Sequence, residues 1–256
     1  MSVKAKKHLG QHFLTDKNIC RKIAKQYGRH QDCNRVLEIG PGMGALTAFM
    51  IEDGLDVTVM EIDTESIAYL NEHFPKLHGK IHNADFLRAD LQEYMGTEPF
   101  AVVGNFPYNI SSQILFKCLD YRNQIPEIMG MFQKEVAVRV AEKPGSKQYG
   151  ILSVILQAFY DIDYCFTVDE HVFNPPPKVK SGVIRLTRND RETLPCNENL
   201  FIQVVKMTFN QRRKTIRNSI KQLIKDKNIE HDYLALRPEV LSVEQFIELT
   251  LLVENS

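Results

Sequence analysis

The chain has 256 residues, of which 43% are hydrophobic and 25% charged, so it can bury a core, and the composition excludes fibrous and disordered classes. The formal net charge is zero, but residues 1–30 carry eight basic and one acidic residue, and residues 206–227 repeat that balance of +7, which leaves −14 for the remainder. Two basic segments on an acidic body favour a polyanionic partner. No apolar run is long enough to span a membrane and no leader peptide is recognisable, so we expect a cytoplasmic protein without a membrane partner.

Short apolar segments alternate along the first 135 residues with stretches long enough for crossover helices. This pattern predicts an α/β fold with a mostly parallel sheet covered by helices. A helix is expected near 150–160, followed by two strands that close the sheet as an antiparallel pair, near 164–168 and 179–187. The expected parallel strands are Arg35–Ile39, Asp56–Glu61, Lys80–Ala84, Phe100–Gly104 and Ile128–Phe132.

A polar, turn-rich stretch near 189–199 marks a domain boundary. We therefore predict a catalytic domain over 1–190 and a small all-helical domain over 191–256. Apolar residues at helical spacing between Ile216 and Ile224 predict a helix there, and Lys214, Arg217, Lys221 and Lys225 give it a basic stripe. Five cysteines are scattered without metal-ligand spacing, so we expect reduced thiols and no metal.

A glycine-rich turn follows the first predicted strand. Gly40, Gly42 and Gly44 permit tight backbone geometry and the close approach of a ligand, and Glu61 ends the next strand about twenty residues on, where it can bind ribose hydroxyls. These features predict an adenosine-containing cofactor. The turn also satisfies a relaxed dinucleotide fingerprint, so a nicotinamide-dependent oxidoreductase stays open, whereas Glu38 and Asp85 favour S-adenosylmethionine.

The sequence Asn105-Phe106-Pro107-Tyr108 follows the fourth predicted strand, at the same edge of the sheet as the glycine turn. The exocyclic amine of adenine is a poor nucleophile because its lone pair is delocalised into the ring. The Asn105 side-chain oxygen and the Phe106 carbonyl could each accept one N–H bond from it, while Tyr108 stacks on the base. The alternative is an ordinary strand-to-helix turn, since Asn and Pro are common in turns.

Nine segments in the same order closely resemble the KsgA (RsmA) family of small-subunit ribosomal RNA adenine dimethyltransferases. The likeness covers nearly the whole chain. The segments are Lys6–Leu14, Leu37–Gly44, Glu61–Asp63, Asn83–Phe86, Gly104–Ser111, Gln133–Ala137, Tyr149–Ser153, Phe173–Val179 and Phe209–Lys214.

The resemblance implies a Rossmann-like class I methyltransferase that dimethylates N6 of two adjacent adenines in the 3′-terminal hairpin loop of 16S rRNA. S-adenosylmethionine would be the donor, the substrate an rRNA within a 30S assembly intermediate, and the protein a monomer without metal. The expected cofactor contacts are Gln11, His12, Leu14, Gly40, Gly42, Glu61, Ile62, Asp85, Phe86 and Asn105. The expected contacts with the target base are Asn105, Phe106, Pro107, Tyr108 and, as a second aromatic wall, Phe173.

Two positions depart from the family pattern, which often has Asn at His12 and Leu or Ile at Phe106. The contact at 12 could come from the backbone or the imidazole, and the role expected of Phe106 uses only its carbonyl. The Arg212-Arg213-Lys214 cluster is expected to contact the rRNA backbone. The alternatives are an Erm-type enzyme that modifies large-subunit rRNA, a DNA adenine methyltransferase, and a non-catalytic RNA-binding ribosome-assembly factor.

Overall fold

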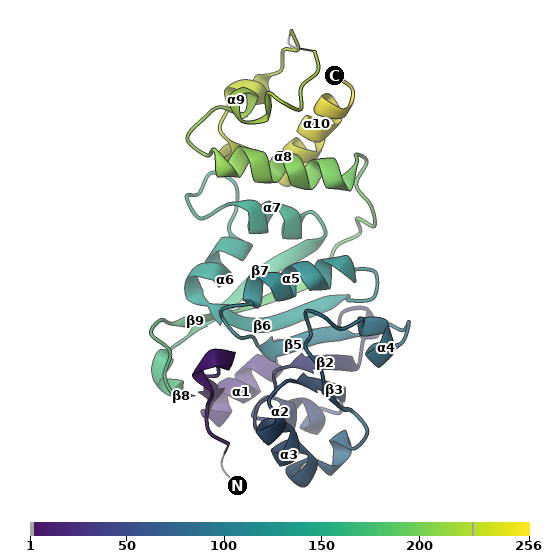
Figure 1. Ribbon diagram of the computed structural model, residues 1–256, viewed down its shortest axis with the longest axis vertical. Coiled ribbons are helices and arrows are strands. Elements are labelled where there is room, and N and C mark those ends of the chain that lie inside the picture. The colour runs from purple at the N-terminus through teal and green to yellow at the C-terminus, as the bar shows by residue number, and fades with distance from the viewer. Residues whose placement is uncertain (1–2, 227) are drawn as a thin grey trace. The chain divides into compact units, whose positions relative to one another are not determined.

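The computed structural model describes residues 3–226 and 228–256, which form two compact units (Figure 1). The first unit consists of Met1–Ala137 and Ile162–Arg188, and the second of Val138–Asp161 and Asn189–Ser256. The second unit thus includes a stretch before residue 162 as well as the segment after Arg188. The assignment of separate functions to domains 1–190 and 191–256 stays a prediction.

A seven-stranded sheet with the order β4-β3-β2-β5-β6-β9-β7 contains the predicted strands. The neighbours from β4 to β6 run parallel, and β9 is antiparallel to β6. The order reverses at β2, because the chain proceeds outward to β3 and β4 before β5 returns to the other side of β2. Open sheets of this kind bind ligands at the carboxyl ends of the strands beside the reversal. The strands are β2 (Arg35–Ile39), β3 (Asp56–Glu61), β4 (Ile81–Asn83), β5 (Ala101–Asn105), β6 (Glu127–Gln133), β7 (Tyr160–Val168) and β9 (Ser181–Arg188).

The five predicted parallel strands are confirmed. Four of them, β2, β3, β5 and β6, are mostly buried, as apolar runs covered on both faces require, whereas β4 at the edge of the sheet is not. The prediction of a helix over 150–160 is wrong at its end, since α7 (Ile151–Gln157) stops early and β7 begins at Tyr160. The carbonyls of Ala158 and Phe159 accept bonds from Arg191 Nη1 at 2.7 Å and from Asn189 N at 3.1 Å. These contacts, which a local pattern does not reveal, replace a further helical turn.

Aspartate side chains cap three of the helices in the first unit. Asp16, Asp63 and Asp90 accept N–H bonds in the first turns of α1, α3 and α4, which satisfies donors that have no partner within a helix. The helices and 3₁₀ turns that begin in this unit are α1 (Lys17–Ala24), α2 (Thr47–Glu52), α3 (Thr64–His73), α4 (Leu91–Met95), α5 (Ser111–Asp120), α6 (Lys134–Ala141), η2 (His30–Asp32), η3 (Pro75–Leu77) and η4 (Glu170–Val172).

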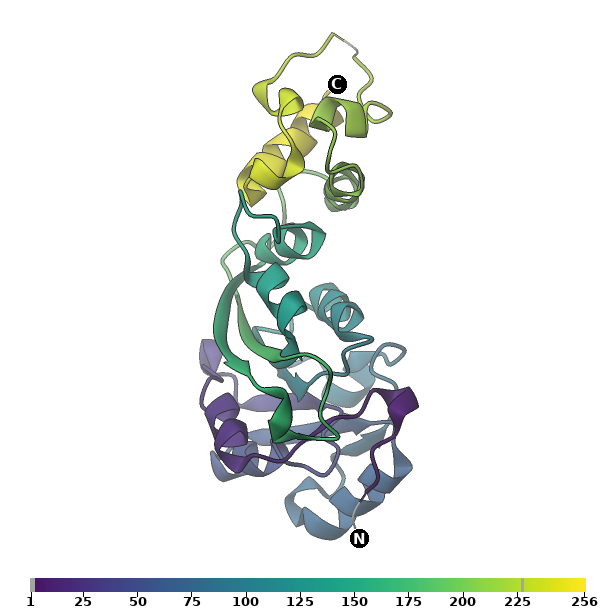
Figure 2. The same ribbon diagram turned by 90° about the vertical axis from the view of Figure 1, so that its left-hand side faces the viewer.

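Residues 6–14 cross the first unit as an ordered segment, which we call the strap. It contains η1 (Lys7–Leu9) and β1 (Phe13–Leu14), and β1 pairs antiparallel with β8 (Phe173–Asn174). Figure 2 shows this purple segment crossing the side of the unit that is turned toward the viewer. The pairing fixes the segment that holds the predicted contacts Gln11, His12 and Leu14.

Apart from the first two residues of β7, all regular secondary structure in the described part of the second unit is helical. Its α8 (Glu198–Asn210) packs against α7, α9 (Ile216–Ile220) and α10 (Val243–Glu254), with η5 (Asp232–Ala235) and η6 (Pro238–Val240) between α9 and α10. The helix predicted between Ile216 and Ile224 is confirmed only over α9, because α9 ends at Ile220. The Arg217 guanidinium instead donates to the Ile229 carbonyl at 2.6 Å, which ties the following segment back to α9.

Candidate active site

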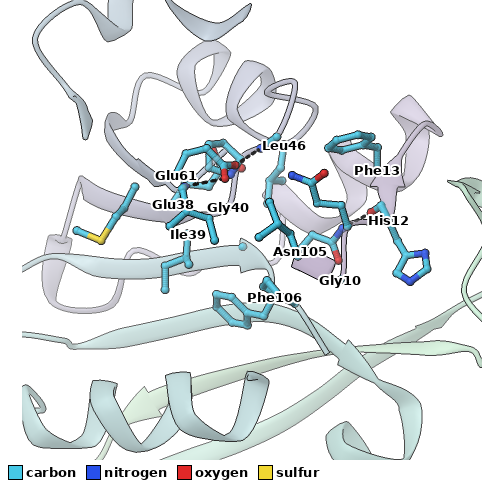
Figure 3. Close-up of a pocket in the computed structure, with 18 of the residues that line it drawn as sticks. Gly10, His12, Phe13, Glu38, Ile39, Gly40, Leu46, Glu61, Asn105 and Phe106 are labelled. Carbon is cyan, nitrogen blue, oxygen red and sulfur yellow. Dashed lines mark hydrogen bonds between the residues drawn. The ribbon is translucent and has the colours of Figure 1, made fainter. Parts of the chain in front are cut away.

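A pocket lies at the carboxyl ends of β2, β3 and β5, all within the first unit. All ten residues predicted to contact a cofactor line it, together with Phe106, Pro107 and Tyr108 from the predicted base-binding set. Figure 3 shows Glu38, Glu61 and Gly40 gathered at one side of this pocket, with Asn105, Gly10 and His12 at the other. Residues distant in the sequence thus meet where the strand order reverses.

The glycine turn leaves room for a ligand beside the end of β2. Gly40 has φ +63°, and a Cβ added there would meet no atom within 4 Å, so its open side faces unfilled space. Gly42 has φ +56°, and a Cβ there would lie 2.7 Å from the Phe13 ring. Side chains are therefore excluded at Gly42 both by backbone conformation and by Phe13, which the strap places over the turn.

Glu61 holds the end of β3 to the glycine turn. Its Oε2 accepts the N–H of Gly42 at 3.1 Å, and its Oε1 accepts those of Ile62 and Asp63 at 2.8 and 2.9 Å. Burial raises the pKa of the Glu61 carboxyl, although the three hydrogen bonds favour its charged form. The carboxylate is fixed by the backbone, and its lone pairs that these bonds do not use are available to a ribose.

Glu38 is a buried carboxyl on β2 and accepts a hydrogen bond from Thr47 Oγ1 at 2.5 Å. Burial raises its pKa to about 8, against the opposing effect of the Thr47 bond, and the Glu61 charge adds to the rise. Near neutral pH the group therefore carries a proton, so that it places no second charge beside Glu61.

The wall suited to an adenine ring is apolar and partly open. Ile62 lines the pocket with 48% of its surface exposed, and Phe86, which is buried, also belongs to the lining. Asp85 accepts the Leu87 N–H at 2.9 Å through Oδ1, while its Oδ2 lies 3.6 Å from Arg88 Nε. A flat apolar surface beside an acceptor matches the faces and edge of an adenine.

The side chain of Gln11 holds the strap in place through hydrogen bonds to Lys6 and Asp63. Its Oε1 accepts the Lys6 N–H at 2.8 Å, and its Nε2 donates to Asp63 Oδ2 at 2.9 Å, while Lys6 Nζ pairs with the other Asp63 oxygen. Burial would raise the pKa of Asp63, but the bonds from Lys6 and Gln11 outweigh it and hold that pKa below its ordinary value. Gln11 still lines the pocket, so its predicted cofactor contact stays a prediction.

The strap also orients Asn105. The Asn105 Nδ2 donates to the His12 carbonyl at 2.9 Å, and because a carbonyl only accepts, the Asn105 Oδ1 is the atom left for a ligand. The His12 ring places Nδ1 2.8 Å from the Pro175 carbonyl, so Nδ1 carries a proton. The backbone at 12, not the imidazole, therefore makes the contact with Asn105, while the ring points away from Glu61 (Figure 3).

Phe106 turns its side chain out of the pocket and into the sheet. The ring is 1% exposed, lies edge-on to Phe132 at 5.1 Å, and sits so close to Gly130 that a Cβ there would come within 2.1 Å of it. Within residues 3–226 and 228–256, no hydrogen bond to the Phe106 carbonyl is present. The side chain thus anchors the turn and leaves the carbonyl available.

Tyr108 and Phe173, both predicted to face the target base, lie in different surroundings. Tyr108 lines the pocket, its hydroxyl lies 2.6 Å from the Oγ of buried Ser181, and its ring stacks on His12 at 5.7 Å between centroids. Phe173 is 4% exposed, belongs to the hydrophobic core and pairs with Leu14 across β1 and β8. Its role as an aromatic wall stays a prediction.

Sequence reasoning missed three supporting residues, namely Phe13, Asp63 and Ser181. Phe13 and Asp63 lie within two of the segments that resemble the family, directly beside the predicted contacts Leu14 and Ile62, so their position in these segments is the available signal. Ser181 begins β9 and has no local signal, because only the β6 to β9 pairing brings it to Tyr108.

The basic residues of the second unit differ in availability. Arg212 donates to the carbonyls of Ser146 and Lys147 at 2.9 and 2.7 Å and is thus a structural residue of this unit. Lys214 and Lys221 are exposed and line a separate hollow on α8 and α9. The predicted RNA contact of the Arg212-Arg213-Lys214 cluster is therefore left to the two exposed side chains, Arg213 and Lys214.

Among positions 3–226 and 228–256, no group of three His, Cys, Asp or Glu side chains could hold a metal ion. In the same part of the chain, no helix combines the length and the apolar character needed to cross a membrane.

Comparison with known sequences gives consistent likenesses over the whole chain. Residues 2–253 match the family described as ribosomal RNA adenine dimethylase. The chain is 56% identical over 253 residues to ribosomal RNA small subunit methyltransferase A of Flavobacterium johnsoniae, covering 98% of this chain and 97% of that protein. It is 58% identical over 256 residues to the protein of the same description from Parabacteroides distasonis, with coverage of 99% and 95%.

Two solved structures share the fold. The 23S rRNA methyltransferase ErmE superposes with a TM-score of 0.72 at 27% identity, covering 94% of this chain and 99% of that one. A dimethyladenosine transferase from Plasmodium falciparum gives a TM-score of 0.76 at 22% identity, covering 95% and 97%, which bears on the fold alone. The predicted Rossmann-like class I methyltransferase fold is confirmed.

Proposed function

The chain belongs to the ribosomal RNA adenine dimethylase family, and we propose that it dimethylates N6 of two adjacent adenines in the 3′-terminal hairpin loop of small-subunit 16S rRNA. It is an enzyme, an rRNA adenine methyltransferase, and its methyl donor is S-adenosylmethionine. The small-subunit assignment is favoured over an Erm-type one because the small-subunit relatives are 56% and 58% identical, against 27% for ErmE.

One observation carries the proposal. Two hydrogen-bond acceptors, Asn105 Oδ1 and the Phe106 carbonyl, stand side by side in the chain at the end of β5 without partners among residues 3–226 and 228–256. The exocyclic amine of adenine has two N–H donors, so this pair of acceptors is complementary to it. Accepting both bonds draws the amine nitrogen away from planarity and restores its lone pair as a nucleophile.

The residues around the glycine turn fit S-adenosylmethionine. When bound, this cofactor supplies an electrophilic methyl group. Gly40 provides unfilled space beside the turn, Glu61 an anchored carboxylate for ribose hydroxyls, and Ile62 with Asp85 a face and an acceptor for the adenine. The neutral state of Glu38 keeps the local negative charge low.

Tyr108 would hold the target base against these acceptors. Its ring is fixed by the hydroxyl contact with Ser181 and by stacking on His12, so it offers a preset face for a flipped-out adenine. A preset aromatic ring lowers the entropic cost of binding because little side-chain freedom is lost.

The substrate, the compartment and the oligomeric state of the enzyme are also part of the proposal. We take the substrate to be rRNA within a 30S assembly intermediate in the cytoplasm, as the family resemblance implies. We take the enzyme to be a monomer, because only four large hydrophobic side chains are exposed in the described chain. These are Ile62, Val179, Leu236 and Val240.

Methyl transfer from labelled S-adenosylmethionine tests the proposed function. Immature small subunits and large-subunit rRNA are offered separately, and nucleosides are then analysed for N6,N6-dimethyladenosine. Dimethyladenosine in the small subunit alone supports the proposal, whereas label in large-subunit rRNA supports an Erm-type enzyme. Cofactor binding without transfer to either substrate would favour a non-catalytic assembly factor.

Replacing Lys214 and Lys221 by Gln tests the role of the second unit. If both lysines neutralise rRNA phosphates, the variant binds rRNA more weakly and the slope of log K against log salt falls by about 1.4 to 1.8. Binding and slope equal to those of the wild type would remove these lysines from the RNA site. Arg212 is left in place because it holds the fold of its unit.

A further inference from the structure

A second hollow borders the candidate active site in the first unit. It is lined by Lys7 and His8 from the strap, by Asn109, which follows Tyr108, and by Gln133 at the end of β6. It shares Gly10, His12 and Tyr108 with the active-site pocket, so the two hollows adjoin at these residues. The function proposed above makes no use of this hollow or of Gln133.

Four polar side chains of this hollow have no partner in the described part of the chain. Within residues 3–226 and 228–256, the side chains of Lys7, His8, Asn109 and Gln133 make no hydrogen bond or ion pair. Single exposed polar side chains commonly face water, but here two amides, an ammonium and an imidazole converge on one hollow. Each amide offers both a donor and an acceptor, and Lys7 offers a positive charge.

The walls of the hollow are fixed by contacts outside it. The His12 and Tyr108 rings stack with an interplanar angle of 24°, His12 bonds the Pro175 carbonyl and Tyr108 bonds Ser181. Gln133 stands opposite Ser181 in the β6 to β9 pairing, so its backbone is held at the same place. Rigid aromatic faces beside amides and a cation are the components of a nucleotide-binding site.

We propose that this hollow, the flanking pocket, binds the adenine next to the one being methylated, with the Asn109 and Gln133 amides on its base edge and Lys7 near its phosphate. The proposal deepens the proposed function and rests on it. Asn and Gln amides pair with the N6 and N7 atoms of adenine, and the reaction modifies two adjacent adenines. Two adjoining pockets thus match two adjoining bases, and the neighbour is held while the first is modified.

The test combines a double variant with altered substrates. Asn109→Ala with Gln133→Ala is compared with the wild type on immature small subunits that carry both adenines, and on two substrates in which each adenine in turn is replaced by uracil. The matched control is Asn71→Ala with Gln92→Ala, which removes two exposed amides from the same unit outside both pockets. Cofactor affinity of every variant is measured by titration calorimetry.

On the two-adenine substrate we expect kcat/KM of the double variant to fall roughly tenfold or more, with unchanged cofactor affinity. On the uracil substrates the wild type has no neighbouring adenine for the Asn109 and Gln133 amides to bind, so kcat/KM of the two enzymes should differ little. An equal loss on all substrates, or no loss on any, would overturn the flanking pocket. A wild type that binds cofactor but methylates none of these substrates would instead refute the proposed function, and the flanking pocket with it.

Discussion

The cofactor side and the base side of the active-site pocket are built differently. On the cofactor side the protein already satisfies its polar groups: Glu61 accepts three backbone N–H bonds, and Glu38 accepts one from Thr47. On the base side Asn105 Oδ1 and the Phe106 carbonyl are free of protein partners within positions 3–226 and 228–256. The cofactor side is thus held in place by hydrogen bonds within the protein, while the base side presents acceptors whose partners must come from the substrate.

The largest effect is expected from Asn105→Ala, which removes an acceptor on the base side. Because its role is to reshape the amine during transfer, kcat should fall by about 10²- to 10³-fold, as in the loss of one transition-state hydrogen bond. Cofactor affinity, measured by calorimetry, should be nearly unchanged. A comparable loss of cofactor affinity would show that the two sides do not act separately.

Gly42→Ala should affect the cofactor side. A Cβ would lie 2.7 Å from the Phe13 ring in a backbone conformation with φ +56°, which costs about 1–2 kcal/mol before any displacement of Phe13. We expect cofactor affinity to fall roughly tenfold or more. Ala at Gly79 is a matched control, since that residue also has positive φ but lies outside the pocket and has open space around it. Equal cofactor affinities in the two variants would show that the turn at Gly42 does not shape the cofactor site.

Tyr108 separates stacking from positioning on the base side. Tyr108→Ala should reduce kcat/KM by the equivalent of about 1–3 kcal/mol through lost stacking. Tyr108→Phe keeps the ring and loses only the contact with Ser181, so we expect a loss of about 1 kcal/mol, and Ser181→Ala should match it. If Tyr108→Phe were as defective as Tyr108→Ala, the hydroxyl rather than the ring would be the functional group.

Glu38→Gln tests the protonation of the buried carboxyl on the cofactor side through its effect on stability. The folded state raises the pKa of Glu38 from its ordinary 4.5 to about 8, so between these values the folded protein retains a proton that the unfolded chain releases. The free energy of unfolding of the wild type should therefore decline as the pH rises from about 5 to 8, by at most about 1.4 kcal/mol per pH unit for this group. Urea denaturation at several pH values measures it. The Gln variant should lack this component, and identical pH profiles would mean that Glu38 is ionised in the folded protein.

The sequence alone determined the strand pattern, the family and thirteen of the residues that line the pocket. Apolar runs fix buried parallel strands because both faces of such a strand are covered, and the segments around Gly40, Glu61 and Asn105 follow strands whose carboxyl ends meet. The sequence-based assignment to the rRNA adenine dimethylase family is confirmed.

Only the tertiary structure decided how individual side chains are used. The Gln11 amide is occupied by Lys6 and Asp63, and the His12 backbone rather than its ring orients Asn105. The α9 helix ends at Ile220, where the predicted basic helix would have continued. The physical reason is that a local pattern gives only periodicity and turn chemistry, whereas many hydrogen-bond partners are brought together by the folded chain. Asp63 lies 52 residues from Gln11, His12 lies 93 residues from Asn105, and Ile229 reaches Arg217 only through the fold of the second unit.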